Sequence, residues 1–148
     1  MALQKDLREF LQSLNSNEVD YLIVGAYAVA YYGFPRLTGD LDIFVGTSEV
    51  NAKRLASAIE VFSRGSIRVE AAELQGADKM LRLGIEPNRV DLLTSITGID
   101  FSAAWADREV TEFDGIPVAL ISRSHLIQNK LSTGRAKDVA DVEELTKE

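Results

Sequence analysis

The sequence predicts an α+β fold in which helices flank a mixed β-sheet. The first part of the chain alternates helical and strand patterns and ends in a long helical pattern. The remainder contains several short strand patterns, two of which flank Asp114-Gly115, a strong hairpin signal. This order of elements implies a mixed sheet with helices packed against it. No repeat, low-complexity tract or linker divides the sequence, so we expect one domain over residues 1–148.

The elements of the first half follow from periodicity and chain breakers. Apolar residues recur at helical spacing near the N-terminus until Asn15-Ser16-Asn17 ends the pattern. A continuously apolar segment then predicts a buried strand, and Gly33 and Pro35 end the short helix that follows it. Thr47 or Ser48 can cap the next helix. The expected elements are a helix over 3–14, a strand over 21–24, a helix over 26–32, a strand over 40–45 and a helix up to Phe62.

The second half contains shorter elements. Polar and apolar residues alternate over 89–93, which is typical of a strand, and Pro87-Asn88 favours a tight turn before it. Gly134 is expected to be a C-cap and hinge between the last two helices. The expected strands are a short one within 66–74, then 79–85, 89–93, 108–113 and 116–121, and the expected helices are 102–106, 124–131 and 136–148.

Composition limits the possible functions. Twenty-three acidic and sixteen basic residues give a net charge of −7, and such a surface repels nucleic-acid backbones unless basic residues gather locally. The chain has no cysteine, which excludes disulfides and thiolate metal sites, and the single His125 leaves no histidine cluster for zinc. No signal-peptide or membrane-span pattern is present, so we expect a cytoplasmic protein with no membrane partner.

The most informative segment joins a glycine-opened helix to a strand with two aspartates. Side chains alternate along a strand, so Asp40 and Asp42 point to one face. Adjacent carboxylates repel each other, and their hard oxygen atoms suit Mg²⁺ or a similar ion. Gly25 opens a helix whose free backbone N–H groups suit a phosphate. Metal and phosphate together indicate nucleotide chemistry, although neither a G-x-G-x-x-G nor a Walker A pattern is present.

Asp91 is a third aspartate on a strand pattern. If its strand pairs with the strand of Asp40 and Asp42, all three carboxylates can converge and hold two divalent ions about 3.5–4 Å apart. One ion would orient a triphosphate, and the other would lower the pKa of an acceptor hydroxyl, with Asp91 as a bridging ligand or general base. The alternative is a set of strand-end aspartates that face solvent.

These residues resemble a known family. The segments Val24-Gly25-Ala26, Arg36-x-Thr38-x-Asp40-Leu-Asp42 and Arg89-Val-Asp91 resemble the nucleotidyltransferase superfamily of the DNA polymerase β type. The resemblance is greatest to small bacterial members: minimal nucleotidyltransferases and the toxin halves of abortive-infection toxin–antitoxin pairs. The tail from Lys130 to Asp141 also looks like the C-terminal segment of those members. The resemblance implies the polymerase β-like fold, two Mg²⁺ ions, and transfer of a nucleoside monophosphate from an NTP to a hydroxyl with release of pyrophosphate.

The resemblance also implies roles for individual residues. Asp40 and Asp42 would bind both metal ions, and Asp91 would complete one of them. Gly25 and Ala26 would approach the phosphates, although Ala26 departs from the usual Gly or Ser and lacks a hydroxyl, which puts tight NTP binding in question.

Four further residues complete the expected nucleotide-binding set. Arg36, Lys130 and Arg135 are expected to contact phosphates, and Thr38 to support the turn before the carboxylates. The alternative for the basic residues is ordinary surface charge.

Two other functions remain open at this stage. The chain could be a protein-binding component of a toxin–antitoxin pair with a vestigial nucleotide site, or a metal-dependent phosphodiesterase with similar ligands. Under the leading hypothesis the acceptor hydroxyl could belong to a protein, an RNA 3′ end or a small molecule, and a cognate antitoxin is a possible partner.

Overall fold

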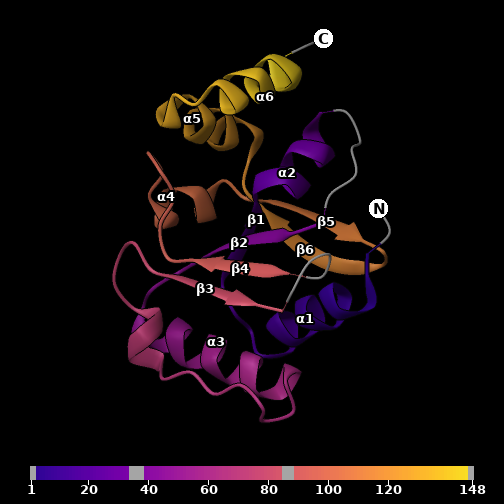
Figure 1. The fold of residues 1–148 in the computed structure, drawn as a ribbon, viewed down its shortest axis with the longest axis vertical. Helices are drawn as coiled ribbons and strands as arrows, with labels where there is room; N and C mark the ends of the chain where they lie inside the picture. The colour runs from indigo at the N-terminus through magenta and orange to yellow at the C-terminus, as the bar shows by residue number, and fades with distance from the viewer. Residues whose placement is uncertain (1–2, 34–38, 85–88, 147–148) are drawn as a thin grey trace.

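The computed structural model describes residues 3–33, 39–84 and 89–146 (Figure 1). Within these ranges six strands form one sheet in the order β3-β4-β2-β1-β6-β5. The strands are β1 (Tyr21–Val24), β2 (Leu41–Val45), β3 (Met80–Leu83), β4 (Val90–Leu93), β5 (Glu109–Phe113) and β6 (Ile116–Leu120). The helices are α1 (Lys5–Ser16), α2 (Gly25–Tyr32), α3 (Glu49–Phe62), the 3₁₀ helix η1 (Ala71–Leu74), α4 (Phe101–Ala106), α5 (Arg123–Thr133) and α6 (Ala136–Thr146).

The sheet is mixed, as the element order predicts. Strand β2 pairs antiparallel with β1 and parallel with β4. Strand β6 pairs parallel with β1, while β3–β4 and β5–β6 are antiparallel pairs. Figure 1 shows α1 and α3 on one side of the sheet and α2, α4, α5 and α6 on the other. The fold is therefore α+β, with helices on both faces of one sheet.

The two faces of the central strands differ in chemistry. Leu41, Ile43 and Val45 alternate along β2, are fully buried, and belong to the main apolar core with α1 and α3. The residues between them point to the opposite face. Phe44 there packs edge-on against Phe101 of α4, with ring centroids 5.0 Å apart. This alternation places Asp42, the polar residue of β2, on the face of the sheet that α2, α4, α5 and α6 cover.

Most predicted elements are confirmed to within a few residues. The predicted strand over 21–24 is β1, and Ser48 caps α3 by accepting a hydrogen bond from the Asn51 backbone N–H at 3.1 Å. Asp114 and Gly115 join β5 to β6 with φ values of 53° and 79°, the left-handed pair that a tight hairpin needs. Gly134 lies at the end of α5 in the same left-handed region.

The strand expected within 66–74 is wrong. Residues 71–74 form η1, because Glu70 and Glu73 make a capping box in which the Glu70 backbone N–H donates to the Glu73 carboxylate at 3.0 Å. This local hydrogen bonding outweighs the apolar pattern of the segment. The turn expected at Pro87-Asn88 lies outside the described residues. Among those described, no helix has both the length and the apolar character that crossing a membrane requires.

Candidate functional site

A row of side chains crosses four strands of the sheet. Backbone register places Asp42 of β2 beside Asp91 of β4, and Asp91 beside Arg82 of β3. On its other side Asp42 pairs with Val24 of β1, the residue that precedes α2. Paired residues on neighbouring strands project to the same face. Two carboxylates and a guanidinium therefore lie next to one another on the face of the sheet that α2, α4, α5 and α6 cover.

Asp40 extends this row along β2. It directly precedes the strand and shares the face of Asp42, two residues later. Its Oδ2 atom accepts a hydrogen bond from Arg89 Nη2, in an ion pair between residues that precede adjacent strands. Its Oδ1 atom is buried and accepts no hydrogen bond from the described residues. Because a buried oxygen without a partner is costly, this atom is suited to a cation or an added donor.

The surroundings of Asp42 disfavour its charged form. Burial, together with the negative charges of Asp91 and Asp40, raises the pKa of its carboxyl to about 6. Lys130 and Arg89 act in the opposite direction and lower this pKa. The charged form of Asp42 is therefore destabilised in the folded protein. A divalent cation beside Asp42 would remove that penalty.

Gly25 places the start of α2 directly on Asp42. It has φ +65°, in the left-handed region, and a Cβ added there would overlap the Asp42 carboxylate oxygen and lie 3.0 Å from the Asp42 Cβ. Both facts require glycine at this position. The close approach sets the first backbone N–H groups of an eight-residue helix beside the carboxylates, where an anionic ligand would also meet them.

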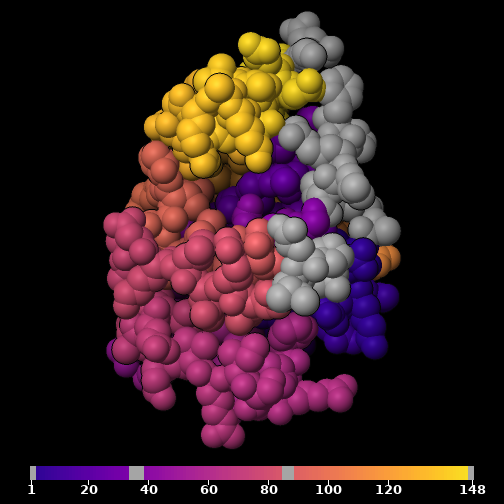
Figure 2. Space-filling model, in the orientation of Figure 1, coloured from indigo at the N-terminus to yellow at the C-terminus, as the bar shows by residue number. Residues whose placement is uncertain are grey.

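A cleft of about 470 Å³ opens above Asp42. Figure 2 shows a hollow between the yellow α5–α6 pair and the pink strands β3 and β4, with residues from earlier in the chain at its base. One wall of the cleft is formed by Asp42, the start of α2 and the loop after β4. The opposite wall is formed by α5 and α6. The lining residues include Gly25, Ala26, Asp42, Ser95, Thr97, Asn129, Lys130, Arg135, Lys137 and Asp138.

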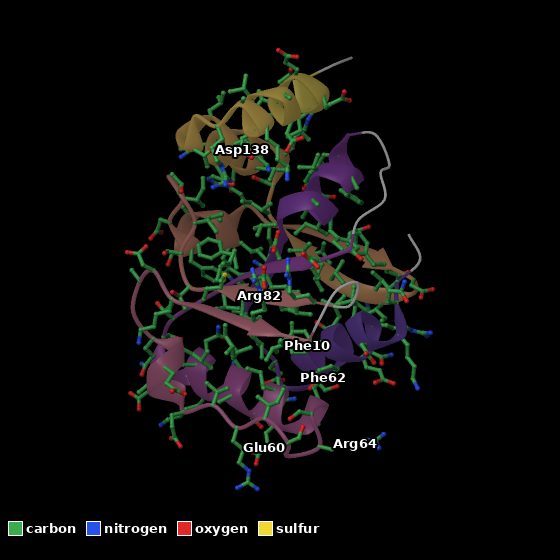
Figure 3. The ribbon with its side chains drawn as sticks, in the orientation of Figure 1. Phe10, Glu60, Phe62, Arg64, Arg82 and Asp138 are labelled. Atoms are coloured by element: carbon green, nitrogen blue, oxygen red, sulfur yellow. The ribbon has the colours of Figure 1, made fainter. Side chains whose placement is uncertain are left out.

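The opposite wall is organised around Asp138 of α6 (Figure 3). Its carboxylate binds Lys130 Nζ at 3.0 Å and Arg135 Nε at 2.7 Å, and it accepts a hydrogen bond from Thr133 Oγ1 at 2.5 Å. Burial raises the pKa of Asp138, but these three donors outweigh it and bring the pKa to about 2. Lys130 also binds Asp141 at 3.1 Å. This network ties the end of α5 to α6 and fixes Lys130 in the cleft.

The structure brings most of the predicted site residues together. Among the cleft-lining residues are five of the nine: Gly25, Ala26, Asp42, Lys130 and Arg135. Asp40 and Asp91 lie beside Asp42, but each is engaged by an arginine. Arg36 and Thr38 lie outside the described residues. The described part of the chain presents no group of three acidic, histidine or cysteine side chains already arranged to hold a metal ion. Metal binding by the three aspartates therefore stays a prediction.

The donor set nevertheless fits magnesium chemically. All three candidate ligands are carboxylates, and one buried oxygen of Asp40 has no hydrogen bond from the described residues. The mutual repulsion that raises the pKa of Asp42 is also the field that a divalent ion would neutralise. Coordination by Asp91 would require Arg82 to share or release its oxygen atoms.

Sequence reasoning missed Arg82, Arg89 and Asp138. Arg89 stands two residues before Asp91 and so shares its face, which a strand pattern could have indicated. Arg82 is a polar residue within an apolar strand pattern, but its pairing with Asp91 depends on the register of β3. Asp138 was part of the tail resemblance, yet nothing in the sequence pointed to its three donors.

Comparison with solved structures relates this arrangement to known proteins. A protein of Thermotoga maritima assigned as a nucleotidyltransferase matches with a TM-score of 0.60 and 19% identity, over 93% of this chain and 88% of that one. An antigenic nucleotidyltransferase-like protein of Paracoccidioides brasiliensis matches with a TM-score of 0.53 and 16% identity, over 98% and 78% of the two chains.

The fold is that of a nucleotidyltransferase. The fold that the sequence resemblance implied is thus confirmed. No family model matches the sequence, and no curated protein matches it. A nucleotidyltransferase fold at this level of identity is a statement about architecture. The reaction has to be argued from the side chains of the cleft.

Proposed function

We propose that the protein is a magnesium-dependent nucleotidyltransferase that moves a nucleoside monophosphate from an NTP to a hydroxyl acceptor and releases pyrophosphate. One observation carries this proposal. Asp42, beside Asp91, is pressed against the positive-φ glycine that opens α2, at the base of a cleft with basic residues on its opposite wall. Metal ligands and phosphate donors thus flank one space large enough for a nucleotide.

In this proposal the three carboxylates would hold magnesium, with Asp40 and Asp42 shared between two ions and Asp91 completing one. Magnesium, when bound, supplies charge that orients the triphosphate and lowers the pKa of the acceptor hydroxyl. Asp91 is the proposed bridging ligand, or the base that takes the hydroxyl proton.

The cleft walls would bind the rest of the NTP. The backbone N–H groups of Gly25 and Ala26 would donate to phosphate oxygens, which needs no side-chain hydroxyl at residue 26. Arg135 is largely exposed, so its remaining N–H groups can contact the leaving pyrophosphate while Asp138 positions it. Lys130 is held more tightly by two carboxylates and would act mainly by lowering the pKa of Asp42. Arg36 and Thr38 keep their proposed roles at the phosphate and the turn.

The acceptor is proposed only as a hydroxyl group, on a protein, an RNA 3′ end or a small molecule. A toxin–antitoxin role with a cognate antitoxin partner is a further possibility carried by the sequence resemblance. The acidic net charge of −7 disfavours extensive contact with a nucleic-acid backbone.

A second candidate function is a protein-binding module whose nucleotide site is vestigial. The observation that favours it is the pairing of Asp91 with Arg82 and of Asp40 with Arg89, since ion pairs could stabilise the carboxylates without any metal. Two observations favour the enzyme instead: a buried oxygen of Asp40 accepts no hydrogen bond from the described residues, and the pKa of Asp42 stays raised although Arg89 lowers it.

A label-transfer assay tests the proposed function. The full chain is incubated with Mg²⁺ and each of the four NTPs labelled at the α-phosphate, with total RNA, total protein or a small-molecule mixture as acceptor. Wild type should transfer label and release pyrophosphate, and Asp42→Asn should reduce the rate by at least about 100-fold.

Asp114→Asn is the matched control. It removes the same charge at the β5–β6 turn, where asparagine adopts the left-handed backbone as readily, and should leave transfer unchanged. Release of NMP from an oligonucleotide would instead indicate hydrolysis. No transfer with any NTP, together with NTP-independent binding of a protein partner, would favour the second candidate.

A further inference from the structure

Arg82 engages both oxygen atoms of Asp91. Its Nε donates to Oδ1 at 2.8 Å and its Nη2 donates to Oδ2 at 3.3 Å, so the contact is bidentate. The Asp91 side chain is 11% exposed, whereas the Arg82 side chain is 48% exposed. Figure 3 shows Arg82 on the strand side of the cleft, away from Asp138 on the helical side. Arg82, which is not among the proposed phosphate-binding residues, thus binds both oxygen atoms of Asp91, a proposed metal ligand.

We propose that Arg82 competes with a divalent cation for Asp91 and thereby sets the affinity of the site for that cation. This inference rests on the proposed function, because it assumes that the three aspartates bind a divalent ion. Arg82 is here a positioning residue, not a catalytic one.

The competition follows from the geometry of the two partners. The backbone of Asp91 is fixed between β2 and β3, so its carboxylate cannot move far to meet an ion. Arg82 stands on β3, the edge strand, and its long side chain borders solvent, so a change of rotamer can withdraw the guanidinium. Of the two residues, Arg82 is therefore the one that can move when an ion takes an Asp91 oxygen.

The second ion pair of the site behaves differently. Arg89 contacts Oδ2 of Asp40 and leaves Oδ1 without a hydrogen bond from the described residues. An ion can use that oxygen while the Arg89 contact remains. Arg82 leaves Asp91 no such free oxygen, which singles it out as the competitor.

The sign of the affinity change separates competition from simple support. If Arg82 only ordered Asp91, its removal would loosen a ligand and weaken ion binding. If Arg82 competes, its removal takes away one positive charge roughly 6 Å from the divalent ion and should strengthen binding by at least about tenfold, the value at the dielectric constant of water. Arg82→Lys keeps the charge but loses the bidentate geometry, so its affinity should lie between those of wild type and Arg82→Gln.

Titration of the full chain with Mn²⁺, followed by the electron paramagnetic resonance signal of the free ion, measures this affinity without any activity assay. The variants are Arg82→Gln, Arg82→Lys and Arg68→Gln. Arg68 is the matched control, because it is 79% exposed and pairs with Glu60 at 3.2 Å, in a segment that the carboxylate row does not include. We expect tighter Mn²⁺ binding by Arg82→Gln, an intermediate affinity for Arg82→Lys, and no change for Arg68→Gln.

Two results would overturn the inference in distinguishable ways. Wild type that binds Mn²⁺ through Asp42, with Arg82→Gln and Arg82→Lys binding no tighter, would refute the competition and leave the proposed function standing. Wild type and Asp42→Asn with equal, negligible affinity would refute the proposed metal site and the inference with it. If Arg82→Gln does not fold, the comparison of Mn²⁺ affinity between Arg82→Lys and wild type decides the question.

Discussion

The two faces of strands β2 and β4 separate stability from chemistry. On the face toward α1 and α3, Leu41, Ile43 and Leu92 are buried in the continuous apolar core. On the other face the same strands carry Asp42 and Asp91 side by side. One face lowers the free energy of the fold by burying apolar area, and the other raises it by crowding negative charge. Under the proposed function, a ligand on the second face would offset this cost.

The largest expected effect on stability lies in the wall opposite the carboxylates. Lys130→Met removes the cation shared by the buried Asp138 and Asp141, so both carboxylates lose an ion-pair partner, although Asp138 keeps its contacts with Arg135 and Thr133. Breaking a buried ion pair in this way costs about 3–5 kcal/mol of unfolding free energy. Urea denaturation at pH 7 measures it. The control is Lys137→Met, which removes an exposed lysine of α6. It should lower the unfolding free energy by less than about 1 kcal/mol.

The apolar face should respond nearly as strongly. Ile43→Ala deletes fully buried methyl groups from the core and should lower the unfolding free energy by about 2–5 kcal/mol. Because Ile43 points away from the carboxylates, binding of Mn²⁺ per folded molecule should be unchanged. Calorimetry at a temperature where the variant is folded checks both quantities. A loss of ion affinity as large as the loss of stability would show that the two faces are not separable.

The adjacent residue on the opposite face should respond with the opposite sign. Asp42→Asn removes a charge that burial, Asp91 and Asp40 all disfavour, so without added metal it should raise the unfolding free energy by about 1–3 kcal/mol. Chemical denaturation of wild type and variant in chelator-treated buffer measures the gain. A variant that is markedly less stable than wild type would mean that Asp42 is a structural residue.

The pH dependence should be the smallest effect and carries a definite sign. The folded pKa of Asp42, about 6, lies above the ordinary aspartate value near 3.8, so the contribution of Asp42 is fully present below about pH 4 and is lost as pH rises to about 6. Asp138 acts oppositely: its folded pKa of about 2 gives stability that is present above about pH 4 and lost as pH falls toward 2. The difference in unfolding free energy between wild type and Asp42→Asn, measured from pH 4 to 7, should isolate the loss of stability that is due to Asp42.

The sequence was sufficient for the framework and for the acidic strand residues. Local signals fixed these parts: a continuous apolar run gave β1, and Asp114-Gly115 gave the hairpin. The segment 66–74 was misassigned because the capping box of Glu70 and Glu73 is a side-chain effect that an apolar pattern does not reveal. The partners of Asp91 and Asp40 were missed for another reason. The ion pair between Arg82 of β3 and Asp91 of β4 depends on strand register, which the sequence around Arg82 does not disclose, whereas Arg89 could have been found from its place two residues before Asp91.

The central claim is that the charged face is a site for magnesium and a nucleotide. The most direct measurement is the melting temperature of wild type and Asp42→Asn with and without Mg²⁺ and each NTP. We expect wild type to gain stability with one or more NTPs only when Mg²⁺ is present, by about 2.7 kcal/mol at a hundredfold excess over the dissociation constant, and Asp42→Asn to gain none. Equal stabilisation of the two proteins, or none of wild type by any NTP, would contradict the account.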